Sequence, residues 1–129
     1  MESRPDIASK SDVKVMLDTF YEKVVLDPLI GPFFTEIVKV NWETHMPVMY
    51  SFWESILLQT HEYRGNPMIK HLALHQKKPM KQEHFDRWVK LFHENIDSKF
   101  SGERAVLAKT RAISIATMIR IKTIQADQA

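Results

Sequence analysis

The chain consists of long segments in which apolar residues recur every three or four positions, separated by short segments that hold most of its prolines and glycines. This spacing places the apolar side chains on one face of a helix, whereas a half-buried strand would need strict alternation. Only three glycines and six prolines interrupt 129 residues. Because proline and glycine end helices and favour turns, the pattern predicts an all-α protein without internal repeats.

Four long helices follow from the positions of the apolar stripes and of the residues that break them. They are expected at about Ser11 to Val25, Thr44 to Leu58, Met80 to Phe100 and Glu103 to Ile124. The last helix carries apolar residues on most sides of its second half, so we expect it to be buried. The pattern predicts one domain over residues 11–124, with a flexible N-terminal segment (1–10) and a C-terminal tail (125–129).

Prolines and glycines also define local features between these helices. Gly31 and Pro32 follow the first helix and leave Phe33 and Phe34 in a short connecting turn. Pro47 lies early in the second helix, where proline is tolerated only in the first turn. Either Thr44 is therefore close to the N-cap, or the helix is kinked at the proline.

Asn66 and Pro67 place an N-cap residue before a proline at a first helical position. This pair predicts a short additional helix that carries His71. Ser9 and Asp12 have the spacing of a capping box for the first long helix.

Composition indicates a soluble globular chain, with 44% hydrophobic and 26% charged residues. The 18 basic and 16 acidic residues are interspersed, so no basic stripe marks a nucleic-acid interface. The polar start lacks the apolar core of a signal peptide, and the longest apolar stretch, Ala112 to Ile121, is too short to span a bilayer. We therefore expect a cytoplasmic protein with neither a nucleic-acid nor a membrane partner.

Six histidines and no cysteine leave two kinds of site open, a histidine metal site or one imidazole that holds a cofactor. His71 and His75 are four residues apart, as zinc ligands on a helix can be, but no carboxylate lies between them. A single histidine is more often a capped or solvated surface residue. That interpretation applies fully to His61, His84 and His93.

Three residues with polar tips, Tyr21, His45 and Trp88, fall on or beside the buried faces of three predicted helices. Buried polar tips need partners. Two explanations stay open, because each tip can bond a backbone carbonyl or all three can converge on a ligand. No phosphate-binding glycine loop and no nucleophile elbow is present.

Four stretches together make the chain resemble the group III truncated haemoglobins from about Asp12 to Arg120. They are Thr19-Phe20-Tyr21-Glu22-Lys23-Val24 with Gly31-Pro32-Phe33-Phe34, Trp42 to His45 with Phe52-Trp53, Tyr63-Arg64-Gly65-Asn66-Pro67 with Lys70-His71-Leu72, and Phe85 to Phe92. The first and third are the most specific. The Gly-Gly pairs typical of groups I and II are absent. The resemblance implies a two-over-two helical sandwich around haem b.

The resemblance also implies a role for individual residues. His71 matches the proximal histidine that ligates the iron, and Tyr21, His45 and Trp88 match the residues of the distal, gas-binding side. Because Pro47 follows closely after His45, whether that ring points into the pocket is left open.

The haem-contacting residues implied by the resemblance lie on several segments. Phe34 matches the phenylalanine that packs on the porphyrin, with Phe33 as the alternative, and Met49 and Trp53 match further lining residues. Arg64 and Lys70 lie near His71 and can pair with the haem propionates, although solvated surface charge is the other interpretation.

The function implied is reversible binding of O₂, CO and NO with high O₂ affinity, because polar donors aimed at the ligand slow its release. Slow release favours NO or peroxide detoxification or sensing, and turnover as an NO dioxygenase or peroxidase would require an external reductase. The alternative is a cofactor-free helical interaction domain, in which the aromatic stripes form the core and the histidines lie at the surface.

Overall fold

The computed structural model describes residues 4–37, 41–60, 75 and 77–128, and all regular structure within these ranges is helical. The elements are α1 (Lys10–Leu26), the short π-helix η1 (Phe33–Ile37), α2 (Trp42–Leu57), α4 (Gln82–Lys99) and α5 (Glu103–Asp127). The all-α prediction is confirmed. The predicted bounds of the first and third long helices are within two residues of α1 and α4.

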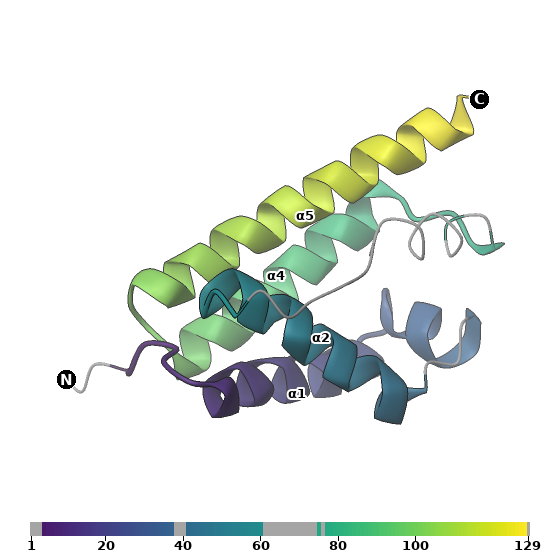
Figure 1. The fold of residues 1–129 in the computed structure, drawn as a ribbon. Helices are drawn as coiled ribbons and strands as arrows, with labels where there is room; N and C mark the ends of the chain where they lie inside the picture. The colour runs from purple at the N-terminus through teal and green to yellow at the C-terminus, as the bar shows by residue number, and fades with distance from the viewer. Residues whose placement is uncertain (1–3, 38–40, 61–74, 76, 129) are drawn as a thin grey trace.

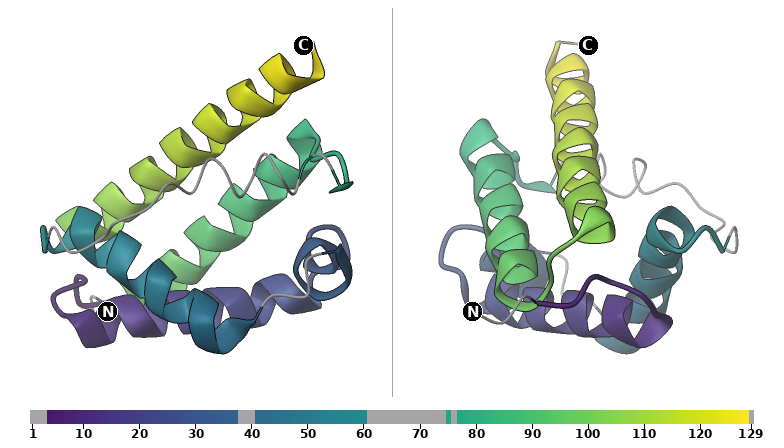
Figure 2. Two further views of the ribbon diagram at one scale, coloured as in Figure 1. Left: turned by 45° about the vertical axis from the view of Figure 1, so that its right-hand side comes forward. Right: turned by 90° about the vertical axis from the view of Figure 1, so that its left-hand side faces the viewer.

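The helices form two pairs that pack on each other. In Figure 1, α4 and α5 run side by side in opposite directions, while α1 and α2 cross each other below them. The turned views of Figure 2 show the same two layers, and α1 joins them because it packs against both α2 and α4. This arrangement confirms the predicted two-over-two helical sandwich.

Helix α1 owes its position to one apolar face and a polar cap. The Ser9 hydroxyl accepts a hydrogen bond from the Asp12 N–H at 3.2 Å, and the Asp12 carboxylate accepts one from the Ala8 N–H at 2.8 Å. These bonds satisfy donors at the helix start that have no partner within the helix. The buried face consists of Val13, Met16, Leu17, Phe20, Tyr21 and Val24.

Helix α2 begins earlier than the sequence predicts. Asn41, not a residue near Thr44, is the N-cap, and its side-chain oxygen accepts a hydrogen bond from the Glu43 N–H at 3.1 Å. Pro47 therefore lies inside the helix, beyond the first turn. Because proline has no N–H, it cannot bond the Glu43 carbonyl in the usual helical pattern.

The prediction that the second half of the last helix is buried is wrong. One face of α5 is covered and consists mainly of Ala105, Ala108, Ala112, Ala116, Ile119 and Thr123. Ile113 and Ile121 are each 48% exposed, and Met118 is 56% exposed. The four alanines on the covered face let α4 approach closely, while Ile113, Met118 and Ile121 lie on other faces of α5. None of the described helices has the length and apolar character needed to span a membrane.

Both predicted flanking segments differ from the structure. Ile7 lies in the core with no exposed surface, and the Pro5 carbonyl accepts a hydrogen bond from the Ser101 N–H at 3.0 Å. Ile7 and the Pro5 carbonyl therefore anchor this segment to the rest of the molecule, although Arg4, Pro5, Ala8 and Ser9 are exposed. At the other end, α5 continues to Asp127, into the segment predicted as a tail.

Asp6 caps α5 across almost the whole length of the chain. Its carboxylate accepts hydrogen bonds from the N–H groups of Arg104 at 3.0 Å and Ala105 at 2.9 Å. Burial by itself would raise the pKa of Asp6, but the backbone donors of Arg104, Ala105 and Ile7 and the Arg104 charge lower the pKa below its ordinary value. The N-terminal segment is thus tied to the start of α5 by charge-assisted bonds.

Replacing Asp6 by Asn should lower the free energy of unfolding at pH 7 by about 1 kcal/mol, the usual scale of an N-cap contribution. Because the pKa of Asp6 is lower in the folded state, its stabilising effect is present above the unfolded value of about 3.9 and disappears as pH falls through the folded value. Urea unfolding at pH 7 and at pH 3 measures this. Asp86→Asn, an exposed change on α4, is the control; equal stability of Asp6→Asn and wild type at pH 7 would contradict the prediction.

Candidate functional site

Four ring side chains from three elements meet beside α1, and we call them the aromatic cluster: Tyr21, Phe34, Trp42 and His45. The Tyr21 ring centroid lies 5.4 Å from Trp42, 5.8 Å from His45 and 6.0 Å from Phe34. Trp42 also contacts His45 at 5.7 Å. Two of the predicted distal residues, Tyr21 and His45, therefore lie next to each other, beside the apolar rings of Phe34 and Trp42.

The turn after α1 places Phe34 in this cluster. Gly31 is buried, and a Cβ atom at this position would lie 2.8 Å from the Val25 carbonyl oxygen and 2.9 Å from that of Val24. Both contacts are with backbone, which cannot move aside as a side-chain end can. The close approach thus requires glycine and directs the chain back toward α2.

Asp27 fixes the same turn from the other side. Its buried carboxylate accepts hydrogen bonds from the Leu29 and Ile30 N–H groups, each at 3.0 Å, and from Arg87 Nε of α4 at 2.8 Å. Burial alone would raise the pKa of Asp27, but the Ile30 donor, the Arg87 hydrogen bond, the Leu29 donor and the Arg87 charge lower it below the usual range. The turn that leads to Phe34 is therefore held against α4.

The Tyr21 side chain is neutral and buried. Burial raises its pKa far above the ordinary value for tyrosine, so the phenol keeps its proton at any physiological pH. Within the described ranges, its ring makes aromatic contacts and its hydroxyl has no hydrogen-bond partner. The explanation that this polar tip bonds a backbone carbonyl thus finds no support in the described residues.

Trp88, the third predicted distal residue, lies one step away from the cluster. Its ring contacts Phe20 edge to face at 5.7 Å and stacks on Phe92 at 5.4 Å. Phe20 in turn contacts Tyr21 at 5.0 Å. The structure therefore connects Trp88 to Tyr21 through a single ring, and Trp88 is only partly buried.

The residues predicted to line the haem site lie in different parts of the structure. Phe34 belongs to the aromatic cluster, whereas Phe33 faces away and contacts His84 at 5.0 Å and the Lys78 ammonium at 4.8 Å. Met49 is partly buried against the main core. Trp53 is 3% exposed and stacks on Phe92 at 4.9 Å, so it is a residue of the core itself.

His71, Arg64 and Lys70 lie outside the described residues, as does His61. The described histidines other than His45 have structural roles. His84 Nδ1 accepts a hydrogen bond from the Lys81 N–H at 2.8 Å at the start of α4, and His93 Nε2 lies 3.0 Å from the Lys109 carbonyl oxygen. Burial and the nearby Lys78 and Lys81 lower the pKa of His84, against the opposing effect of Glu83.

The zinc interpretation of His71 and His75 loses one of its two ligands. Both ring nitrogens of His75 are engaged, Nδ1 by the Met80 N–H at 2.9 Å and Nε2 by the Asp127 carboxylate at 2.8 Å. A ligand nitrogen must have a free lone pair. Among the described residues, no group of three or more histidine, aspartate or glutamate side chains is placed to hold a metal ion.

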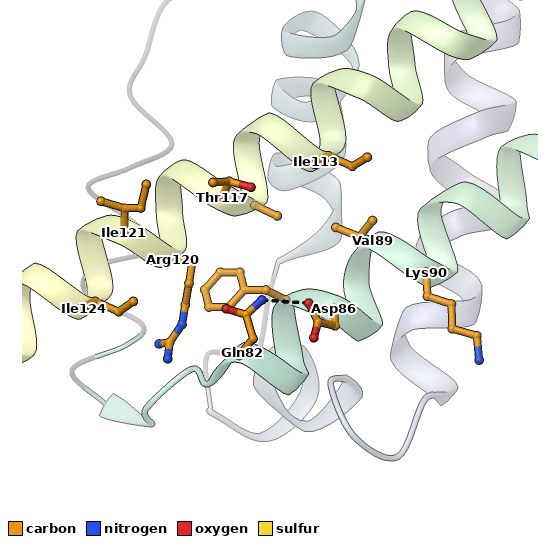
Figure 3. Close-up of a pocket in the computed structure, with 11 residues that line it drawn as sticks. Gln82, Asp86, Val89, Lys90, Ile113, Thr117, Arg120, Ile121 and Ile124 are labelled. Carbon is orange, nitrogen blue, oxygen red and sulfur yellow. Dashed lines mark hydrogen bonds between the residues drawn. The ribbon is translucent and has the colours of Figure 1, made fainter.

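Of two hollows on the described surface that we compare, only one borders the aromatic cluster. The larger, about 520 Å³, lies between α4 and α5 and contains none of the predicted site residues; its lining includes Val89, Ile113 and Arg120 (Figure 3). The smaller, about 230 Å³, lies between α1 and α2 and is lined in part by Tyr21, Trp42 and Met46. The hollow that matters for the predicted chemistry is therefore the smaller one.

The fold and this cluster define a globin. The family model of the bacterial-like globins matches residues 6–122, and the chain belongs to that family. It is similar to the group 3 truncated hemoglobin of Campylobacter jejuni, with 32% identity over 112 residues that cover 84% of this chain and 86% of the relative. The crystal structure of group III truncated hemoglobin from Campylobacter jejuni matches with a TM-score of 0.77 and 30% identity over 90% of this chain and 91% of that one. The predicted resemblance is confirmed.

Sequence reasoning missed two contributors to the site. Trp42 occurs in a stretch that carries the resemblance, but nothing in the pattern assigned its ring to the contacts with Tyr21 and His45. The pair of Asp27 with Arg87 joins residues 60 positions apart. Asp27 before a proline was a recognisable turn signal, whereas its partner on α4 could not be found without the fold.

Gly31→Ala should destabilise the protein by about 1–3 kcal/mol, because the added methyl group meets backbone atoms that must shift. The shift should also displace Phe34 from Tyr21. Urea unfolding monitored by fluorescence measures the first effect, and the ring-current shifts of the Tyr21 and Phe34 protons measure the second. Lys90→Ala, an exposed change on α4, is the control, and a Gly31→Ala protein as stable as that control would refute the steric argument.

Proposed function

We propose that this globin binds haem b and reversibly binds O₂, CO and NO, with His71 as the iron ligand and Tyr21 as the main hydrogen-bond donor to the gas. The observation that carries the proposal is the aromatic cluster, in which the rings of Tyr21 and His45 lie together beside Phe34 and Trp42. The similar protein from Campylobacter jejuni is a truncated hemoglobin, which supports the same assignment.

The residues present fit a flat, mostly apolar group. Phe34, Met49 and Trp88 pack against the core and are each only partly buried, so each keeps apolar surface for a further contact. Phe34 is preferred to Phe33, which is buried against His84 on the other side of the turn. When bound through one imidazole, haem supplies an iron with an open position for a diatomic ligand.

The chain's own contribution is a dry surrounding with a fixed donor. The Tyr21 phenol stays protonated because burial raises its pKa. A gas ligand that gains negative charge in this site would accept a hydrogen bond from Tyr21, and the low local dielectric would strengthen that bond. Trp88 is the second donor we propose, because its ring is connected to Tyr21 through the single ring of Phe20. His45 contacts Tyr21 and Trp42, and we propose that it restricts access of the gas to them.

Wild-type protein reconstituted with ample haem should give the visible spectrum of a five-coordinate, histidine-ligated ferrous haem when deoxygenated, and a CO complex on exposure to CO. His71→Gly should lose that ferrous spectrum or release haem, because the substitution removes the imidazole that we propose binds the iron. His93→Ala, which removes an imidazole bonded to the Lys109 carbonyl, is the matched control and should leave the spectrum unchanged. A colourless wild-type protein would refute the haem proposal and favour a cofactor-free interaction domain.

Tyr21→Phe should speed O₂ dissociation about tenfold or more, since a hydrogen bond to a charged acceptor contributes ~1.5–3 kcal/mol. The matched control is Tyr50→Phe, which removes a phenol of α2 that bonds the Asp18 carboxylate instead. Stopped-flow replacement of O₂ by CO measures the rate. An unchanged rate in Tyr21→Phe would mean that this hydroxyl does not contact the ligand.

NO dioxygenase or peroxidase-like turnover remains a proposal that depends on a partner. Slow O₂ release would suit it better than transport, but the electrons must come from an external reductase. Consumption of NO by the oxygenated protein, first without and then with a reductase, separates single-turnover reaction from catalysis.

A further inference from the structure

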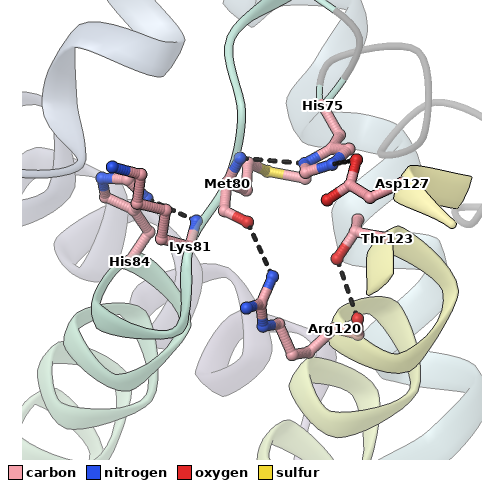
Figure 4. Close-up of polar contacts among 7 residues, drawn as sticks. All are labelled: His75, Met80, Lys81, His84, Arg120, Thr123 and Asp127. Carbon is pink, nitrogen blue, oxygen red and sulfur yellow. Dashed lines mark hydrogen bonds and ion pairs between the residues drawn. The ribbon is translucent and has the colours of Figure 1, made fainter. Parts of the chain in front are cut away.

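His75 is almost completely buried, and both of its ring nitrogens make directional bonds. Nδ1 accepts a hydrogen bond from the Met80 N–H at 2.9 Å, and Nε2 lies 2.8 Å from Asp127 Oδ1 (Figure 4). An amide N–H can only donate, so Nδ1 must be unprotonated and the proton must be on Nε2. One tautomer of the ring is therefore fixed, with Nε2–H donating to the Asp127 carboxylate.

Met80 is held at its backbone carbonyl as well as at its N–H. The carbonyl oxygen accepts a hydrogen bond from Arg120 Nη1 of α5 at 3.1 Å. Arg120 and Asp127 thus approach the His75–Met80 segment from positions about two turns apart on α5, as Figure 4 shows. We call His75, Met80, Arg120 and Asp127 the Met80 anchor.

The anchor differs from the apolar contacts elsewhere between the helices. Apolar packing tolerates small slides and rotations, whereas three hydrogen bonds with fixed donors and acceptors define both position and direction. The anchor therefore determines where the chain at residue 75 sits relative to the last two turns of α5. His71 precedes it by four residues, which span at most about 14 Å of extended chain.

We propose that His75 and Asp127 are positioning residues for the iron ligand: they fix the chain at residue 75, four residues after His71, and would thereby set the orientation in which the His71 imidazole binds the iron. This inference rests on the proposed function, because it takes His71 as the ligand. It assigns a role to the C-terminal turn of α5, which lies outside the segments that carry the aromatic cluster.

The decisive variants are Asp127→Ala, His75→Leu and His75→Asn in the haem-loaded full chain. Resonance Raman spectra of the deoxygenated ferrous protein report the iron–histidine stretching band, which depends on the orientation and strain of the proximal imidazole. Asp127→Ala and His75→Leu should shift or broaden that band. His75→Asn should restore it in part, because an Asn oxygen can accept from the Met80 N–H and its amide can donate to Asp127.

Two further measurements accompany the spectrum. Haem release should become about two- to fivefold faster in Asp127→Ala, a modest change because that carboxylate is exposed to solvent. In the protein without haem, hydrogen exchange of the Met80 amide should speed up by a similar factor, since its acceptor ring loses one of its two constraints. The second readout does not depend on the loaded protein.

The matched control is Asp97→Ala, which removes an equally exposed carboxylate that pairs with Lys109 at 2.7 Å near the opposite end of α4. It should leave the band, the release rate and the Met80 exchange unchanged. A wild-type band in both Asp127→Ala and His75→Leu would overturn the positioning role while the haem proposal stands. If His75→Leu does not fold, Asp127→Ala decides alone, since its side chain is 61% exposed at a helix end. Failure of the wild-type chain to take up haem would overturn the proposed function, and this inference with it.

Discussion

The contact between Phe20 and Phe92 determines how the rest of this molecule is arranged. Both side chains are only 1% exposed, and their rings meet nearly edge to face at 5.0 Å where α1 packs on α4. Successive residues on a helix differ in direction by about 100°, so once Phe20 faces α4, Tyr21 must face sideways toward α2. On α4, Trp88 lies one turn from Phe92 and stacks on it. A single aromatic contact between two helices therefore orients both Tyr21 and Trp88.

The periodic pattern predicted the helices well, because most of the apolar residues that recur every three or four positions do form the buried faces, whereas the pairing of the helices was implied only by the resemblance. It failed where burial depends on a partner. The alanines of α5 are covered since α4 approaches closely, whereas Ile113 and Ile121 on the same helix remain about half exposed. Hydrophobicity alone would have reversed that order. Likewise, the cap of α5 comes from Asp6, nearly a hundred residues away, and no local signal can reveal it.

The candidate site was predicted in part by its residue types and in part by resemblance. The helical period placed Tyr21 and His45 on or beside buried faces, and the structure brings their rings to 5.8 Å from each other. The sequence did not decide between Phe33 and Phe34 as the residue of the site, because both follow the same Gly-Pro turn. What separates them is the π-helical turn of η1, in which Phe34 points to Trp42 while Phe33 packs against His84. Such a turn has no clear signature in a single sequence.

Buried polar side chains give the fold its register, and Tyr21 differs from them. Asn95 donates to the Met16 carbonyl at 2.9 Å and joins α4 to α1, Asp27 joins the turn after α1 to α4, and His75 joins Met80 to the end of α5. Each of these groups uses a hydrogen bond to connect two parts of the chain, which apolar packing alone does not align so narrowly. The Tyr21 hydroxyl makes no such connection within the described ranges. A phenylalanine would fill the same space, so packing within the described ranges does not by itself explain why this position carries a hydroxyl.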